Sequence, residues 1–154
     1  MRSTDEGFAP DTVGHFMRRD FVFADASDSL DTVGRMMRVA SLRHVPVVQG
    51  GNLVGTVSYR RLQDAWAHRV EEHLEDGLRR ERRNLEIALW AENDPLAVDA
   101  SCPLKEAVRR MLDCRVGYLP VVEGEGDPPR LIGILTEADL IRIAYERGVY
   151  GPPD

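Results

Sequence analysis

The sequence predicts a mixed α/β (α+β) fold in which one structural unit occurs twice. Three observations predict it. Helix-like and strand-like apolar patterns alternate along both halves of the chain. Each half has a valine-rich run, a turn and a second apolar run, which is typical of a β-hairpin. Residues of the first half recur in the second half at a nearly constant offset. Both halves therefore read strand–helix–strand–strand–helix, and we expect two such units to pack together.

The first copy begins with an extended segment at residues 21–24 and continues into an amphipathic helix. Asp25, Ser27 and Asp28 offer side-chain oxygens that suit a helix start. A strand over residues 45–48, a hairpin turn at Gly50-Gly51, a return strand over 53–57 and a helix from about Ser58 are then expected. The first helix has a buried stripe with the spacing of one helix face, formed by Leu30, Val33, Met36, Met37 and Ala40.

The second copy repeats this order at a fixed distance along the chain. Leu30 corresponds to Leu104, an offset of 74 residues. After the hairpin, Gly55 corresponds to Gly133, and the offset becomes 78. The four extra residues lie in the second hairpin loop, where an insertion costs little.

A polar stretch with helical spacing, about residues 59–83, connects the two copies. It contains the basic run Arg79-Arg80-Glu81-Arg82-Arg83, but the chain has a net charge of −6. Nucleic-acid binding depends on neutralising phosphates, so we expect a solvated helix face here; a DNA-binding regulator is a less favoured alternative that rests only on this run. Asn84 is suited to cap a further helix that carries Ile87.

Several classes of function are disfavoured by composition. No apolar run is long enough to span a bilayer, and the first residues lack a secretory pattern, so we expect a cytoplasmic protein without a membrane partner. The histidines and the two cysteines show no spacing typical of a metal or nucleophile site. We therefore expect no catalytic residue, no metal and no required cofactor.

Residues 133–139 form the motif on which the functional prediction depends. Thr136 lies where a strand ends and a helix begins, so its hydroxyl and the helix N-terminus could hold a phosphate. Asp139, one turn later, could accept both hydroxyls of a ribose, and Ile134 could supply an apolar wall. Thr136 and Asp139 also fit a capping box, which would explain both residues without a ligand.

The first copy departs from this motif at one position. Arg61 lies where the second copy has Asp139. A guanidinium has only donors and cannot accept ribose hydroxyls. A cation in the first helical turn is also unfavourable by roughly 0.3–1 kcal/mol. This second site is therefore expected to be empty, or to bind an anionic group through Arg61.

The two copies together resemble a known family. The matching motifs are Val45-Pro46-Val47-Val48 and Leu119-Pro120-Val121-Val122, each followed by a hairpin and a Gly-x-x-Ser/Thr motif. With these motifs the sequence resembles a tandem pair of CBS (cystathionine-β-synthase) domains over about residues 12–147. The resemblance implies two βαββα units, 12–68 and 86–147, about a pseudo-twofold axis. A helical linker would occupy 69–85, and residues 1–11 and 148–154 would be tails.

The resemblance also implies a function. Such modules are non-catalytic sensors that bind AMP, ADP, ATP, NAD or S-adenosylmethionine as a regulatory ligand between the units. Many form homodimers shaped as a flat disc and regulate another protein, which the sequence does not identify. An alternative is a structural or dimerisation module with vestigial clefts. The implied cleft would be lined by Thr136, Asp139, Ile134, Val22, Phe21, Asp20, Arg43 and His44. The sister cleft would be lined by Thr56, Ser58, Arg61, Asp94, Leu96, Gly117 and Tyr118.

Overall fold

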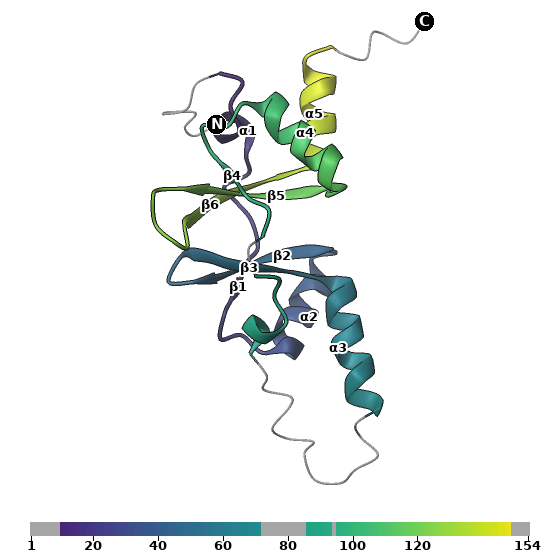
Figure 1. Ribbon diagram of the computed structural model, residues 1–154. Coiled ribbons are helices and arrows are strands. Elements are labelled where there is room, and N and C mark those ends of the chain that lie inside the picture. Colours follow the sequence, from purple (N-terminus) through teal and green to yellow (C-terminus); the bar gives the residue numbers. More distant parts are fainter. Residues whose placement is uncertain (1–9, 72–85, 94, 149–154) are drawn as a thin grey trace, which may run out of the picture. The chain divides into compact units, whose positions relative to one another are not determined.

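The computed structural model of the protein describes residues 10–71, 86–93 and 95–148. Both copies contain the predicted strand–helix–strand–strand–helix order (Figure 1), so the predicted mixed α/β fold is confirmed. The first copy consists of β1 (Ala24–Asp25), α2 (Leu30–Val39), β2 (His44–Gln49), β3 (Asn52–Ser58) and α3 (Tyr59–Glu71). The second consists of β4 (Val98–Asp99), α4 (Leu104–Cys114), β5 (Tyr118–Glu123), β6 (Arg130–Thr136) and α5 (Glu137–Glu146).

The strand pairing repeats residue by residue in the two copies. β1 pairs in parallel with β2, which pairs antiparallel with β3, and β4, β5 and β6 do the same. Val47 faces Gly55 in the first hairpin, and Val121 faces Gly133 in the second. Both hairpins have a register shift one residue later. The offsets read from the sequence therefore correspond to equivalent places in the two hairpins.

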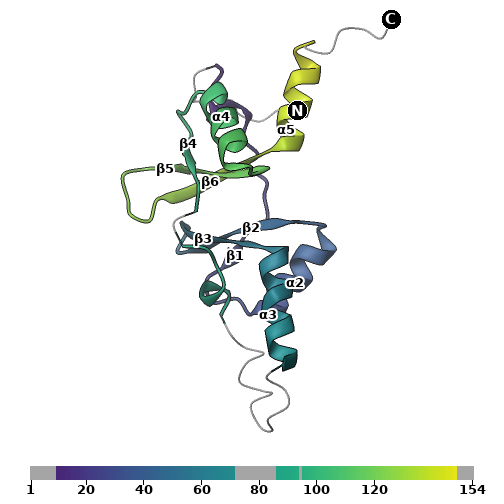
Figure 2. The ribbon, with the colours of Figure 1, turned by 45° about the vertical axis from the view of Figure 1, so that its right-hand side comes forward.

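In each copy the two helices cover the same face of the three strands. α2 and α3 lie together on one side of the first hairpin, and α4 and α5 do so in the second copy (Figures 1 and 2). Each helix turns an apolar stripe to the strands, and burying one large aliphatic side chain stabilises the fold by about 1.5–3 kcal/mol. Equivalent residues fill both cores: Met37 and Met111, Val45 and Leu119, Val47 and Val121, Val57 and Leu135.

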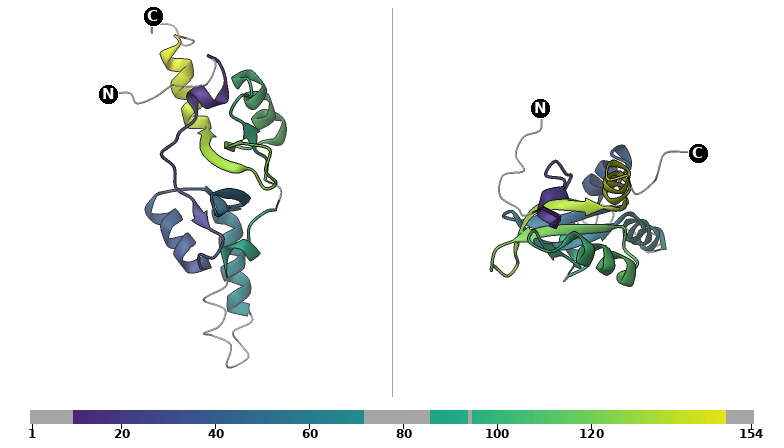
Figure 3. Two further views of the ribbon diagram at one scale, coloured as in Figure 1. Left: turned by 90° about the vertical axis from the view of Figure 1, so that its left-hand side faces the viewer. Right: turned by 90° about the horizontal axis from the view of Figure 1, so that it is seen from above.

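Each copy also packs against the short segment that precedes the other copy. We call residues 12–18 and 86–92 the leading segments. The first contains α1 (Val13–Phe16) and the second the 3-10 helix η3 (Ile87–Leu89). Val13 N donates to Cys102 O at 2.8 Å, and Ile87 N, 74 positions later, donates to Asp28 O at 2.7 Å. Figure 3 shows α1 against the strands of the second copy.

Because each copy packs against the leading segment of the other, the chain forms two compact units. Among the described residues, those within Met1–Phe21 and Leu96–Asp154 form one unit, and those within Val22–Pro95 form the other. Each unit therefore combines one strand–helix copy with the leading segment of the other copy. The leading segment of residues 12–18 reaches the second copy across most of the sequence.

The start of α2 and the helix around Ile87 differ from the sequence prediction. The N-cap of α2 is Ser29, whose Oγ accepts from Thr32 N at 3.1 Å. The predicted capping residue Asp25 instead accepts from Ser27 N at 3.0 Å, which shapes the turn between β1 and α2. Around Ile87 the chain forms a 3-10 helix that Glu86 precedes. Asn84, the basic run at 79–83, most of the predicted linker and the ends of both predicted tails lie outside the described residues.

Candidate functional site

Thr136 and Asp139 form a capping box at the start of α5. Thr136 N donates to Asp139 Oδ2 at 3.0 Å, and Asp139 N donates to Thr136 Oγ1 at 3.4 Å. The Thr136 hydroxyl also donates to Oδ2 at 2.8 Å. The capping interpretation of this motif is therefore confirmed, and such a cap stabilises a helix by on the order of 1 kcal/mol.

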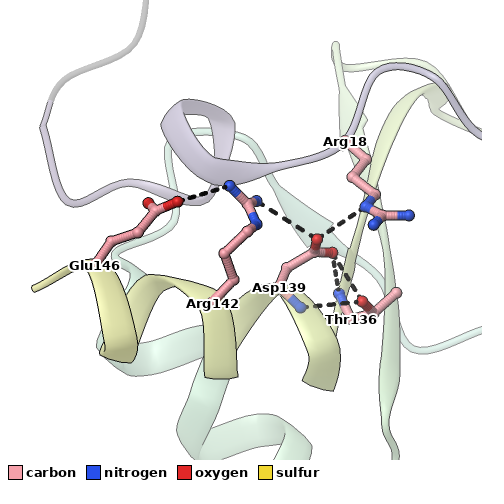
Figure 4. A network of polar contacts seen from close by, with 5 residues as sticks. All are labelled: Arg18, Thr136, Asp139, Arg142 and Glu146. Atoms are coloured by element: carbon pink, nitrogen blue, oxygen red, sulfur yellow. Dashed lines mark hydrogen bonds and ion pairs between the residues drawn. The ribbon is translucent and has the colours of Figure 1, made fainter. Parts of the chain in front are cut away.

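The other carboxylate oxygen of Asp139 is held by arginines. Arg18 Nε donates to Oδ1 at 2.9 Å, and Arg142 lies 3.6 Å from the same oxygen and 3.6 Å from Glu146 (Figure 4). Asp139 is 0% exposed, and among the side chains that the structure describes no other charged one is buried. Burying a carboxylate is costly unless it is paired and hydrogen-bonded. The capping bonds and the arginines together meet this requirement.

Arg18 reaches Asp139 because its leading segment is bonded to β6. Arg18 N donates to Ile134 O at 2.8 Å, and Ile134 N donates to Arg18 O at 3.0 Å. The adjacent Gly133 permits this approach, since a Cβ there would lie 2.9 Å from Arg18 O and 2.6 Å from Met17 Sδ. Arg18 is absent from the site residues that the sequence predicts.

The first copy has the same arrangement with the two charges exchanged. Thr56 N donates to Glu92 O at 3.2 Å and Glu92 N donates to Thr56 O at 2.7 Å. Ser58 Oγ accepts from Arg61 N at 3.2 Å, so Ser58 takes the place of Thr136. Arg61 Nη1 lies 3.8 Å from Glu92 Oε1, with the two side chains 47% and 64% exposed. A long ion pair between exposed groups contributes little.

The exchange of charges can be seen in the sequence. Arg18 and Glu92 are related by the 74-residue offset, and Arg61 and Asp139 by the 78-residue offset. Both relations change the sign of the charge. Comparing the leading segments as well as the copies would therefore have identified Arg18 as the partner of Asp139.

The remaining residues predicted for the main cleft belong to both units. Asp20 and Phe21 follow Arg18 in the unit that contains Ile134, Thr136 and Asp139. Val22, Arg43 and His44 belong to the other unit, and their approach to Asp139 stays a prediction. Loss of solvation lowers the pKa of His44, while the Glu92 carboxylate raises it and Arg43 lowers it.

The residues predicted for the sister cleft are divided in the same way. Thr56, Ser58 and Arg61 lie in one unit, and Leu96, Gly117 and Tyr118 lie in the other. Asp94 is outside the described residues. Leu96 packs against the core of its unit, and burial raises the pKa of the Tyr118 hydroxyl.

Gly117 and Arg43 perform the same structural task in the two copies. Gly117 O accepts from Glu137 N at 3.0 Å, and Arg43 O accepts from Tyr59 N at 2.8 Å. Each carbonyl thereby satisfies the first N–H of the helix that follows the hairpin. These bonds fix where α5 and α3 begin relative to β5 and β2.

The described residues contain neither a helix suited to span a membrane nor a cluster suited to hold a metal. Within 10–71, 86–93 and 95–148, no helix has the length and apolar character needed to cross a membrane. Over the same residues, no group of three or more histidine, cysteine, aspartate or glutamate side chains is placed to hold a metal ion.

Comparison with known proteins identifies the repeated unit. The CBS domain family matches residues 13–68 and 88–146. A CBS domain-containing protein of Dictyostelium discoideum is 30% identical over 131 residues, which cover 84% of this chain and 88% of that protein. Protein MJ1225 of Methanocaldococcus jannaschii is 28% identical over 136 residues, covering 86% of this chain. The chain spans only 46% of MJ1225.

Solved structures show the same fold. The crystal structure of MJ1225 superposes with a TM-score of 0.73 at 26% identity, covering 86% of this chain and 47% of that one. The structure of CBSX2 from Arabidopsis thaliana in complex with AMP gives 0.72 at 27% identity, covering 88% of this chain and 97% of that one. With its repeat, its strand pairing and these matches, the chain belongs to the CBS domain family and carries two CBS domains in tandem.

Proposed function

We propose that the protein is a non-catalytic regulatory module that binds an adenosine-containing ligand at Asp139. The observation that carries the proposal is Asp139 itself, a buried acid at the start of α5 beside the Thr136 hydroxyl. Support comes from CBSX2, a CBS-pair protein that is 27% identical over 88% of this chain and was solved with AMP. Candidate ligands are AMP, ADP, ATP, NAD and S-adenosylmethionine.

The chemistry of the motif assigns a part of the ligand to each residue. Asp139 accepts the ribose hydroxyls, and Thr136 with the N-terminus of α5 receives a phosphate. Ile134 and Val22 lie against the adenine, and Asp20, Phe21, Arg43 and His44 complete the lining. Ligand binding then changes how the module acts on a regulated protein. We further propose that the module works in the cytoplasm as a homodimer.

A second candidate function is a structural or dimerisation module whose clefts no longer bind a ligand. One observation favours it. Asp139 already has its helix cap, Arg18 and Arg142 as partners, so the fold needs no ligand to compensate its charge. The two candidates differ in whether a small molecule can compete with these partners.

Binding measurements with a conservative variant separate the two candidates. We expect isothermal titration of the wild type with the five ligands to find one site per chain for at least one of them. The same ligand should raise the melting temperature, because it binds the native state. Asp139→Asn retains an acceptor for the cap but loses the charge, so binding should fall at least about tenfold while the fold is kept.

The matched control is Asp113→Asn, which removes an exposed acid of α4 in the same unit. This variant should bind like the wild type. A pure capping role for Asp139 predicts equal binding by Asp139→Asn and the wild type. If none of the five ligands shifts the melting temperature, the structural module is the correct function.

A further inference from the structure

We propose that Arg18 makes the Asp139 site selective for charge, so that it takes a phosphorylated nucleoside in preference to an uncharged one. This inference rests on the proposed function and specifies its ligand class. It assigns a role in specificity to a residue of the leading segment, outside the Gly-x-x-Ser/Thr motif.

The first step is that no ligand can reach Asp139 while its neighbours keep their places. The carboxylate is 0% exposed, and its nearest charged partner is Arg18 at 2.9 Å, whose side chain is 55% exposed. Oδ2 accepts from the backbone N–H and the hydroxyl of Thr136, and both contacts belong to the cap of α5. Ribose hydroxyls must therefore take the place of the Arg18 guanidinium at Oδ1.

The second step concerns where the displaced guanidinium can go. The backbone of Arg18 is held to Ile134 by hydrogen bonds of 2.8 and 3.0 Å. Only the side chain can move, so the positive charge stays within one side-chain length of Asp139. It has then lost a charge-assisted hydrogen bond to a buried carboxylate, which is among the stronger interactions in a protein.

The third step is the compensation that a ligand can offer. A phosphate next to the ribose provides oxygens that a guanidinium can bind in a bidentate manner. An uncharged nucleoside replaces the ion pair with neutral hydroxyls and leaves Arg18 without an anion. A nucleotide should therefore bind more tightly than the nucleoside with the same base and sugar.

The first copy provides an internal comparison. Its leading segment has Glu92 where the second copy has Arg18, bonded to Thr56 in the same way. The residue at this position faces the helix residue of opposite charge in both copies. A ligand that separates the ion pair therefore meets the charge of the leading segment. This charge is positive in the second copy (Arg18) and negative in the first (Glu92).

Titration with AMP and adenosine tests the inference. We expect the wild type to bind AMP at least about tenfold more tightly than adenosine, the difference expected for one charge-assisted bond. Arg18→Gln should bring the two affinities within about threefold of each other, without weakening adenosine. Arg142→Gln is the control, because Arg142 also faces Asp139 Oδ1 and is 53% exposed, but it shares its charge with Glu146. This control should keep the wild-type preference for AMP.

Four results of these titrations would overturn the inference. Equal affinities for AMP and adenosine in the wild type, both lost in Asp139→Asn, would reject it and leave the proposed function standing. An unchanged preference in Arg18→Gln would place the selection elsewhere. An equal loss of preference in Arg142→Gln would indicate a general charge effect. Absence of binding by both ligands would reject the inference, and the proposed function would fall with it only if ADP, ATP, NAD and S-adenosylmethionine did not bind either.

A second variant, Arg18→Lys, tests the inference if Arg18→Gln fails to fold. Arg18→Lys keeps the charge on the leading segment but lacks the planar fork. It should retain a preference for AMP that is smaller than that of the wild type. Equal affinities for AMP and adenosine in a folded Arg18→Lys protein would also reject the inference.

Discussion

Arg18 and Glu92 occupy equivalent positions in the two leading segments and carry opposite charges. Each is bonded through its backbone to the equivalent strand residue, Ile134 or Thr56. Each faces a helix residue of the opposite sign, Asp139 or Arg61. Reversing only one member of such a pair would bring like charges together, so the two members have to differ together between the copies.

The reversed pair predicts how a second site could be made. Glu92→Arg combined with Arg61→Asp gives the first copy the charges of the second. If Asp139 binds a nucleotide as proposed, isothermal titration of the double variant should find two sites per chain where the wild type has one. A stoichiometry that stays at one would show that these two positions do not define the site.

The single variants are the controls for this experiment. Glu92→Arg alone places two guanidinium groups together, and Arg61→Asp alone places two carboxylates together. Because both side chains are largely exposed, we expect each single change to destabilise the fold by only about 0.3–1 kcal/mol. The double variant should recover this loss, which urea denaturation of the four proteins measures as a coupling energy.

A larger effect is expected where an arginine pairs with the buried acid Asp139. Arg18→Gln removes the charged hydrogen bond to Asp139, and we expect the free energy of unfolding to fall by about 1.5–3 kcal/mol. Arg142→Gln removes a contact of 3.6 Å between the same acid and a half-exposed arginine, so its cost should lie within about 0–1 kcal/mol. Equal losses in urea denaturation would mean that Arg18 is no stronger a partner than Arg142.

Gly133 is required for the close approach of the leading segment. In Gly133→Ala the new Cβ would lie 2.6 Å from Met17 Sδ and 2.9 Å from Arg18 O, so the segment must move. We expect a loss of about 1–3 kcal/mol in the free energy of unfolding. Gly55→Ala should behave alike, because its Cβ would lie 2.8 Å from Glu92 O.

Gly126→Ala is the control for these glycine variants. Gly126 lies in the second hairpin loop, where the nearest atom to a new Cβ is Pro128 O at 3.3 Å. Its melting temperature should stay close to that of the wild type. Wild-type stability in Gly133→Ala would contradict the importance of this approach.

The side chains at the contact between the two helices differ in size between the two copies. Gly34 on α2 lies against Trp66 on α3, and a Cβ at Gly34 would lie 2.4 Å from Trp66 Cζ2. The equivalent residues of the second copy are Val108 and Ala144. Gly34→Val should therefore destabilise the fold by about 1–3 kcal/mol through overpacking.

Exchanging both residues tests whether the volumes compensate. In Gly34→Val with Trp66→Ala, the first copy acquires the residues of the second. We expect the double variant to be more stable than the sum of the two single changes predicts, as residues in contact are not additive. Strict additivity in thermal or urea unfolding would show that the two positions are energetically independent.

The sequence repeat made most of the fold predictable, because each element depends on local patterns. The stripe from Leu30 to Met37 and the alternation of buried and half-buried residues in β3 are set by neighbours along the chain. The helix cap at Thr136 and Asp139 is also local, and it was predicted. By contrast, Arg18 and Asp139 are 121 positions apart, and no local pattern joins them. Only one signal in the sequence indicates the contact between Arg18 and Asp139: both positions carry the opposite charge in the first copy.

The exchange of leading segments also has a consequence for the order of synthesis on the ribosome. The unit within Val22–Pro95 combines the first copy with the leading segment of residues 86–92, so all of its parts are available once Pro95 has been made. The other unit combines α1 with strands and helices that lie after Leu96 and are made later. Domains fold as units during synthesis. Val13 and Arg18 are translated well before β6 and α5, so they can pack only after these later elements have been made.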